Sequence, residues 1–179
     1  PMRESFMKQL ASVPGVAAIT PVRVIDVQVA TGSLAADPEA NDQFYFQAID
    51  PLTYRQVGDM EFSANQGDSA QNWARLSQGQ ALFVSSTVAD RYNLRQGDTV
   101  SLLTRRGEKP FYIAAEVVDF TGQSQMFYGT YEDLHNLFNA RGVDRFTIAV
   151  DRAYAVDSVM QEIKERFQKS YNISIQTTE

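Results

Sequence analysis

The sequence predicts an α+β fold in which an α/β layered subdomain, built from both chain ends, carries an inserted β-rich subdomain. Helix-like and strand-like segments alternate at the two ends, whereas most of the irregular β structure lies in the middle. Of the 179 residues, 44% are hydrophobic and 21% are charged, which is typical of a globular chain that buries a sizeable core. We expect residues 1–30 and 129–179 to form the α/β subdomain and residues 31–128 to form the insertion.

The N-terminal segments predict one helix and one long strand. Residues 3–12 place apolar side chains at helical spacing, and a Pro-Gly pair ends the pattern. Residues 16–30 have strand character, with a break or bulge expected near Pro21. Residues 31–43 are a loop by their content of Gly, Ser, Asp, Asn and Pro.

A strand and two capped helices follow this loop. Residues 44–49 read as a strand because apolar and aromatic side chains dominate them. Asp50 can cap a short helix over residues 52–56, since proline stands at the first helical position. Asp68 or Ser69 can cap the second helix, which carries the single tryptophan on its apolar face.

Residues 81–120 carry the most regular pattern of the chain. The apolar run over residues 81–84 is too short for a helix and favours a buried strand. Ser86 or Thr87 can then cap a helix that runs through Tyr92.

A glycine turn and a hairpin complete this central unit. Gly97 suits a left-handed or otherwise strained backbone, and the Asp98 side chain can bond the backbone of its own turn. Residues 99–104 predict a strand, and residues 105–109 predict the loop of a hairpin. The second hairpin strand ends in Val-Val-Asp.

The C-terminal segments alternate strands and helices. Thr130 and Asp133 resemble a capping box with Asp in place of Glu, and they open a helix. Apolar side chains at a spacing of three to four residues predict the clearest helix of the chain, over residues 156–167. Three strands are expected here, over residues 126–128, 145–150 and 171–176.

Composition excludes several classes of function. The net charge of −6 argues against a nucleic-acid partner, because binding phosphates requires a basic face. The absence of cysteine excludes disulfides, zinc-thiolate sites and thiol catalysis. No apolar run approaches the roughly 20 residues that cross a bilayer. The chain starts without the pattern of a signal peptide, so we expect it to be an internal piece of a longer protein.

The sequence offers no convincing catalytic, metal or cofactor site. Residues 37–42 begin like a calcium loop, but they lack its glycine and its bidentate Glu, so a solvated loop is favoured. Residues 122–126 resemble a nucleophile elbow without its second glycine. The single histidine, His135, has no second histidine or cysteine to complete a zinc site, and it is the one candidate for the base of a triad. The chain contains no phosphate-binding loop for ATP hydrolysis.

Two groups of side chains leave a choice between packing and binding. Five cations could form a basic patch for a partner or lipid head groups, although a solvated loop and helix end is the favoured interpretation: Arg91, Arg95, Arg105, Arg106 and Lys109. Three aromatic residues near the expected subdomain junction favour packing over ligand contact: Phe127, Tyr128 and Tyr131.

One long pattern resembles a known family. An apolar strand, the helix VSSTVADRYNL, the turn L-x-x-G-D-x-V around Gly97 and Asp98, and a strand ending in VVD follow one another in the centre. LASVPGVAAITPV precedes them, and TYEDLHNLF, DRFTIAVD and a long amphipathic helix follow. Together these segments cover essentially the whole chain and resemble the extracytoplasmic domain of MacB-type (FtsX-like) permeases of ABC transporters.

The resemblance implies a role without chemistry of its own. Such a domain couples ATP-driven motion of membrane helices to a substrate or partner on the extracytoplasmic side of the cell membrane, as a relatively rigid lever. It implies one membrane helix before the chain and three after it. The implied partners are an ABC ATPase subunit or domain in the cytoplasm, a second permease copy, and an adaptor or a lipid or peptide substrate. No cofactor is implied.

Two other functions stay open on the sequence. One is a stand-alone extracytoplasmic module that binds a small ligand or a peptide. The other is a hydrolase with an acidic site among Asp50, Asp59 and Glu61.

Overall fold

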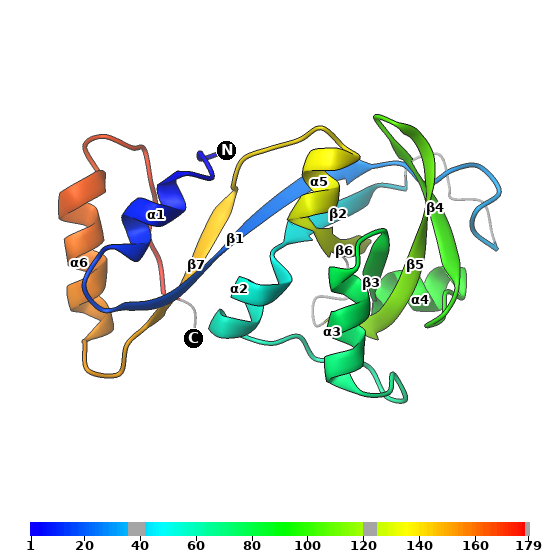
Figure 1. Ribbon diagram of the computed structural model, residues 1–179, viewed down its shortest axis with the longest axis horizontal. Helices are drawn as coiled ribbons and strands as arrows, with labels where there is room; N and C mark the ends of the chain where they lie inside the picture. Colours follow the sequence, from blue (N-terminus) through cyan, green and yellow to red (C-terminus); the bar gives the residue numbers. More distant parts are fainter. Residues whose placement is uncertain (36–41, 120–124, 178–179) are drawn as a thin grey trace.

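A computed structural model describes residues 1–35, 42–119 and 125–177 of the chain, and Figure 1 shows their elongated arrangement. Seven strands form one mixed sheet in the order β4-β5-β3-β6-β2-β1-β7. The strands are β1 (Val16–Val27), β2 (Phe44–Ile49), β3 (Ala81–Ser85), β4 (Thr99–Thr104), β5 (Gly107–Val117), β6 (Met126–Thr130) and β7 (Arg145–Val150). The helices of the described residues are α1 (Phe6–Ala11), α2 (Pro51–Val57), α3 (Ser69–Ser77), α4 (Ser86–Tyr92), α5 (Tyr131–Asn136) and α6 (Val156–Phe167). The expected α+β class is confirmed.

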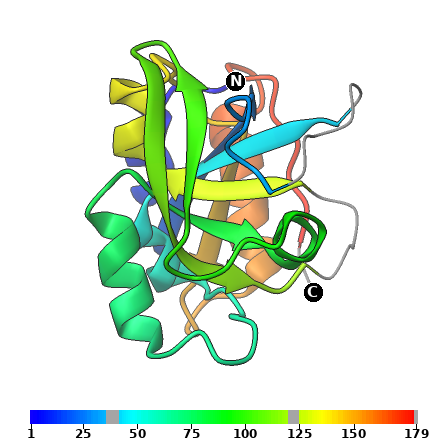
Figure 2. The same cartoon turned by 90° about the vertical axis from the view of Figure 1, so that its right-hand side faces the viewer.

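The long strand β1 connects the two halves of the molecule. From Val16 to Val22 it pairs antiparallel with β7, and from Val22 to Val27 it pairs antiparallel with β2. The sheet continues through parallel pairing of β2 with β6 and of β3 with β5, and through antiparallel pairing of β3 with β6. Figure 2 shows the molecule from its β4–β5 end, where the green β4–β5 hairpin runs across the direction of the cyan β2. A strong twist therefore separates the two ends of one sheet.

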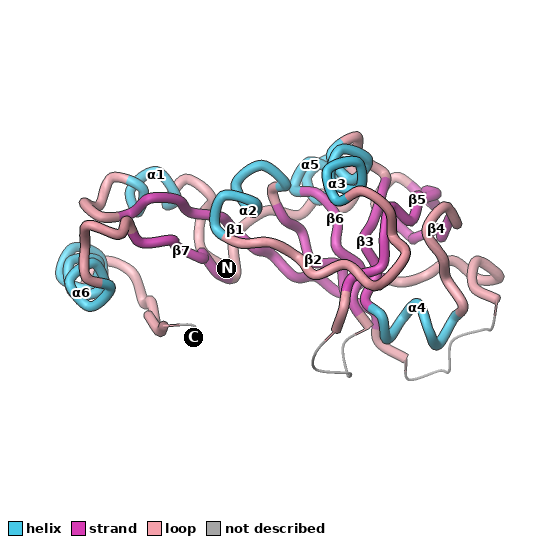
Figure 3. The backbone as a smooth tube through the Cα atoms, turned by 90° about the horizontal axis from the view of Figure 1, so that it is seen from below, coloured by secondary structure: helices cyan, strands magenta, loops and turns pink. Residues whose placement is uncertain are grey.

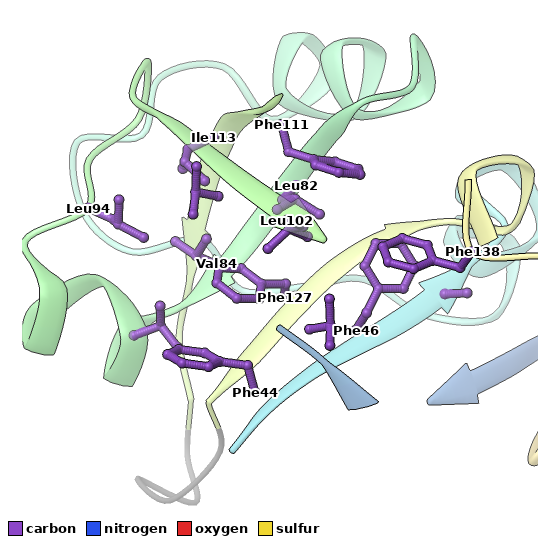
Figure 4. Close-up of a cluster of buried hydrophobic side chains, with 14 of the residues drawn as sticks. Phe44, Phe46, Leu82, Val84, Leu94, Leu102, Phe111, Ile113, Phe127 and Phe138 are labelled. Carbon is purple, nitrogen blue, oxygen red and sulfur yellow. The ribbon is translucent and has the colours of Figure 1, made fainter. Parts of the chain in front are cut away.

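Three clusters of buried apolar side chains stabilise this sheet. The first cluster, shown in Figure 4, packs residues of β2, β3, β4, β5 and β6 against α4 and α5. It contains Phe46, Leu82 and Phe127. The second cluster surrounds Trp73 of α3. The third cluster joins α1 and α6 to β1 and β7, and the Phe6 and Phe167 rings meet edge to face with centres 5.1 Å apart. Figure 3 shows both helices at the β7 end of the molecule. Strand β1 contributes one fully packed residue to each cluster, namely Val27, Val22 and Ile19 in that order.

The helix starts agree with the expected caps at three of four places. Asp50 Oδ1 accepts hydrogen bonds from Leu52 N and Thr53 N, and Asp68 Oδ1 accepts one from Ala70 N. The expected cap of α4 is wrong by one residue. Ser85 Oγ accepts the bond from Val88 N, because β3 extends to Ser85 and the helix begins directly after it.

The expected capping box at α5 forms only on one side. Thr130 Oγ1 accepts a hydrogen bond from Asp133 N at 3.1 Å, as a cap does. The Asp133 carboxylate does not return to the cap; its Oδ2 accepts a hydrogen bond from Gln80 N at 2.8 Å instead. Asp133 therefore links α5 to the residue that precedes β3.

Strand β1 is regular at Pro21, where a break was expected. The irregular register lies between Val16 and Ala18. At Pro21 the strand has β7 as its only partner among the described strands, since pairing with β2 begins at Val22. The missing N–H of proline is tolerated where one side of a strand has no ladder to interrupt.

The expected hairpin loop over residues 105–109 is too long. Strand β5 already starts at Gly107, and Glu108 and Lys109 pair with Leu103 and Leu102. The turn is therefore confined to Arg105 and Arg106, and the positive φ of Gly107 (89°) accommodates it.

The expected C-terminal strand over residues 171–176 is also wrong. Residues 171–177 form no strand, because they join no ladder of the sheet. Ile173 and Ile175 pack against the third cluster instead. Among the helices of the described residues, none combines the length and the apolar character that crossing a bilayer requires.

Candidate functional site

A polar hollow of about 320 Å³ is lined by residues of β2, β5, β6 and β7 and by the segment of α2 and the residues after it. We call it the junction hollow. Its lining comes from separate parts of the chain: Gln47, Tyr54, Asp59, Met60, Glu61, Val117, Val118, Tyr128 and Arg145. Two of the three acidic residues of the hydrolase hypothesis, Asp59 and Glu61, are therefore together here. Asp50 is not among them, because its carboxylate caps α2.

The secondary structure explains why these side chains converge. Gln47 and Tyr128 are partners in the parallel pairing of β2 with β6. Tyr54 lies on α2, directly after β2, and Arg145 opens β7 opposite Val22 of β1. The carbonyl of Glu61 accepts a hydrogen bond from Val118 N at 2.8 Å, which fixes the segment after α2 along the end of β5.

The two tyrosines of the hollow remain neutral over the physiological pH range. Burial is the main cause that raises the pKa of Tyr128 to about 12, and the negative charge of Asp119 and the neighbouring Tyr54 add to it. Burial also raises the pKa of Tyr54, where Arg145 opposes the shift and Asp59 reinforces it. Neither phenol hydroxyl has a hydrogen-bond partner in the part of the chain that the structure describes. Both can therefore donate to a bound molecule.

The charged residues of the hollow are weakly engaged by the protein. Within residues 1–35, 42–119 and 125–177, the Arg145 guanidinium forms no ion pair. Asp59 Oδ1 accepts a hydrogen bond from the adjacent Met60 N at 2.8 Å. Over the same residues, no cluster of three or more His, Cys, Asp or Glu could hold a metal ion. The hollow thus combines a free cation, two carboxylates and two neutral hydroxyl groups.

A second groove of about 460 Å³ lies between α2 and α3. It is lined by Pro51, Leu52, Arg55, Gln56, Ala70, Trp73, Ala74 and Ser77. Leu52 is 72% exposed, and the guanidinium carbon of Arg55 lies 5.5 Å from the centre of the Trp73 ring. Trp73 is buried, and its Nε1 has no hydrogen-bond partner among the described groups. The residues that line this groove include no acid and no histidine, and the Ser77 hydroxyl donates to Trp73 O at 2.8 Å.

The other residues singled out in the sequence do not assemble into a site. His135 Nε2 lies 2.7 Å from Glu4 Oε1, and among the described residues no serine hydroxyl bonds to its ring. Most of the calcium-like segment (residues 37–41) and the core of the elbow-like segment (residues 122–124) lie outside the described residues. Gly97 has a φ of 96°, and Asp98 Oδ2 accepts a hydrogen bond from Arg95 N, as expected for a turn.

The five cations of the central unit lie at two places. Arg91 of α4 forms an ion pair with Asp42, with 3.0 Å between Nη2 and Oδ1. Arg105 N donates to Leu137 O, so the hairpin turn lies beside the residue that follows α5. Figure 2 shows the hairpin tip at the top and α4 well below it.

The three aromatic residues also separate. Phe127 stacks on Phe44 in the first cluster, with ring centres 5.7 Å apart. The Tyr131 hydroxyl donates to Gly142 O at 3.1 Å. Tyr128 alone lines the junction hollow. Sequence reasoning did not single out Arg145, Gln47 or Tyr54, because nothing in their neighbourhood along the chain shows that they face one another.

Comparison with known proteins identifies the fold. No protein-family model and no curated protein matches the chain. Among solved structures, the extracellular domain of the noncanonical ABC-type transporter YknZ from Gram-positive bacteria aligns with a TM-score of 0.63 and 15% identity, over 90% of this chain and 78% of that one. The periplasmic region of MacB from Actinobacillus actinomycetemcomitans aligns with a TM-score of 0.63 and 13% identity, over 94% of this chain and 74% of that one. The fold expected from the resemblance is confirmed.

Proposed function

We propose that this chain is the extracytoplasmic domain of an ABC transporter permease, which couples ATP-driven motion of membrane helices to export or to an extracytoplasmic partner. The observation that carries the proposal is the shared fold: extracellular and periplasmic permease domains align over at least 90% of the chain. The ATPase, a second permease copy, and an adaptor or a lipid or peptide substrate are the partners of this proposal.

A division of the chain into two subdomains is part of this proposal. Residues 1–30 and 129–179 form one subdomain of this proposal, and residues 31–128 form the other. The third cluster joins α1 near one end of the chain to α6 near the other, and the Phe6 and Tyr171 rings stack at 4.4 Å. Helix α5 packs in the first cluster, so the subdomains share a packed contact. Movement of either chain end would reach the inserted part through β1.

A labelling experiment tests the location of the domain. The chain contains no cysteine, so a single introduced cysteine reports its position without background from this domain. In the full-length protein, Leu103→Cys on β4 offers a thiol at a 40% exposed position, and Leu102→Cys beside it is a matched buried control at 0%. We expect a membrane-impermeant maleimide to label Leu103→Cys in intact spheroplasts and to leave Leu102→Cys unlabelled. Labelling of Leu103→Cys only after lysis would overturn the proposal.

The flanking gene sequence tests the membrane part. One run of about 20 apolar residues before the chain and three after it support a permease. Polar flanks on both sides would favour the stand-alone binding module, for which the junction hollow is the observation in its favour.

A further inference from the structure

The lining of the junction hollow carries both signs of charge. Arg145 enters from β7, whereas Asp59 and Glu61 enter from the segment after α2. We propose that this hollow binds a small zwitterion, whose carboxylate contacts Arg145 and whose ammonium group contacts Asp59 and Glu61. The proposal does not depend on the proposed transport function, because it concerns binding by the chain itself.

The carboxylate side of the site is Arg145. Its side chain is exposed, and within the described ranges it has no carboxylate partner. The neighbouring Arg23 differs, because its Nη1 lies 2.8 Å from Asp144 Oδ1 in an ion pair. A free guanidinium matches a carboxylate with two parallel hydrogen bonds. Arg145 is therefore the cation of this region that is available to an anion.

The ammonium side of the site combines charge and aromatic surface. Asp59 and Glu61 are exposed and line the hollow together. Tyr54 and Tyr128 lie beside them as neutral rings, and an ammonium group is attracted to the face of such a ring. The Gln47 amide adds one further polar group. Two carboxylates with two rings are a suitable environment for a primary ammonium group.

The size and the apolar part of the lining of the hollow limit the ligand. A volume of 320 Å³ is room for about ten water molecules at about 30 Å³ each, which corresponds to a ligand of roughly ten non-hydrogen atoms. Met60, Val117 and Val118 add apolar surface to the same lining. A free amino acid or a dipeptide with small side chains meets these limits.

The test uses three related compounds and the ¹⁵N-labelled 179-residue chain. L-Alanyl-L-alanine carries both charges, its N-acetyl derivative lacks the ammonium group, and its C-terminal amide lacks the carboxylate. Amide chemical shifts are followed during titration with each compound. We expect saturable shifts at Val117, Val118 and Met60 with alanylalanine, and affinities at least about tenfold weaker for both derivatives, since each loses a charge-assisted interaction.

Two variants assign the charges to residues. Arg145→Gln should bind alanylalanine and its amide equally weakly. Glu61→Gln should bind alanylalanine and its N-acetyl derivative with more similar affinities than the parent chain does. Arg152→Gln is the matched control, because Arg152 is exposed beyond the other end of β7 and should leave all affinities unchanged. The spectrum of each free variant reports whether it is folded.

Three results would overturn the proposal. They are equal binding of the three compounds, shifts confined to residues outside the hollow, and no saturable shift with alanylalanine. None of these results bears on the transport proposal, which the thiol labelling tests separately.

Discussion

The Nε2 atom of His135 lies 2.7 Å from Oε1 of Glu4, so α5 is joined to the segment that leads into α1. The other carboxylate oxygen of Glu4 accepts a hydrogen bond from Gly142 N at 3.2 Å. The Glu4 carboxylate thus connects the start of the chain to α5 and to Gly142, both of which follow β6.

We expect the Glu4–His135 pair to stabilise the fold measurably. Both side chains are about one-third exposed (33% and 27%), so the coupling energy between them should be about 0.5–1 kcal/mol. The measurement is a double-mutant cycle of urea unfolding with Glu4→Ala, His135→Ala and the double variant. Glu132→Ala, an exposed neighbour on α5, should show no coupling to Glu4→Ala. Additive effects of the first two substitutions would contradict the prediction.

Gly129 of β6 is required by packing rather than by its backbone angles. A Cβ atom at this position would overlap the ring of Phe46 and come within 3.3 Å of Leu82. We expect Gly129→Ala to lower the free energy of unfolding by about 1–3 kcal/mol, because the buried ring must move. Phe46→Leu removes the overlapping ring atoms, so the double variant should be less destabilised than the sum of the single variants. Strict additivity would show that the overlap is relieved elsewhere.

Gly97 is required by its backbone angles rather than by packing. Its φ is 96°, and an added Cβ would meet only the Tyr112 hydroxyl, at 3.9 Å. Gly97→Val should destabilise the chain by about 1 kcal/mol or more, since a β-branched residue disfavours positive φ. The control is Gly58→Val, because Gly58 has an extended backbone with a φ of −163° and open space around its Cα. An unchanged melting temperature for Gly97→Val would refute this interpretation.

Asp133 makes the stability of the fold depend on pH. Burial raises the pKa of its carboxyl above the ordinary value, against the hydrogen bonds from Gln80 and Thr130 that oppose the shift. A carboxyl with a raised pKa in the folded state contributes stability fully below its unfolded pKa of about 3.9, and that contribution is lost as pH rises through the folded value. As the pH rises from acidic to neutral, the free energy of unfolding of Asp133→Asn should therefore increase relative to that of the parent chain. Urea unfolding of both chains across this range checks the sign, and a constant difference would contradict it.

Local patterns in the sequence predict most of the elements. Asp50 before a proline marks the start of α2, and the spacing of Val159, Ile163 and Phe167 marks the buried face of α6. Both signals act within one or two helical turns, so they can be read without knowledge of the tertiary structure. The start of α4 was misplaced because three hydroxyl residues in a row can each serve as a cap, and only the end of β3 selects Ser85.

Contacts between distant segments could not be predicted in the same way. Gln47 of β2 faces Tyr128 of β6 in a parallel pair, and no periodicity indicates which strands become neighbours. The junction hollow depends on this pairing and on the position of Arg145 at the start of β7. Asp59 and Glu61 were recognised as candidate acids by residue type, but their cationic neighbour becomes visible only in the folded chain.

The distribution of β1 residues over all three clusters has a mechanical consequence. A pull along the axis of this strand loads its hydrogen bonds to β7 and to β2 in shear, so many bonds must break together instead of one after another. A slip by one residue would turn Ile19, Val22 and Val27 out of their clusters at the same time. The strand therefore has no small displacement of low energy: it transmits tension at full length, and it yields only when the packing at both ends of the molecule is lost at once.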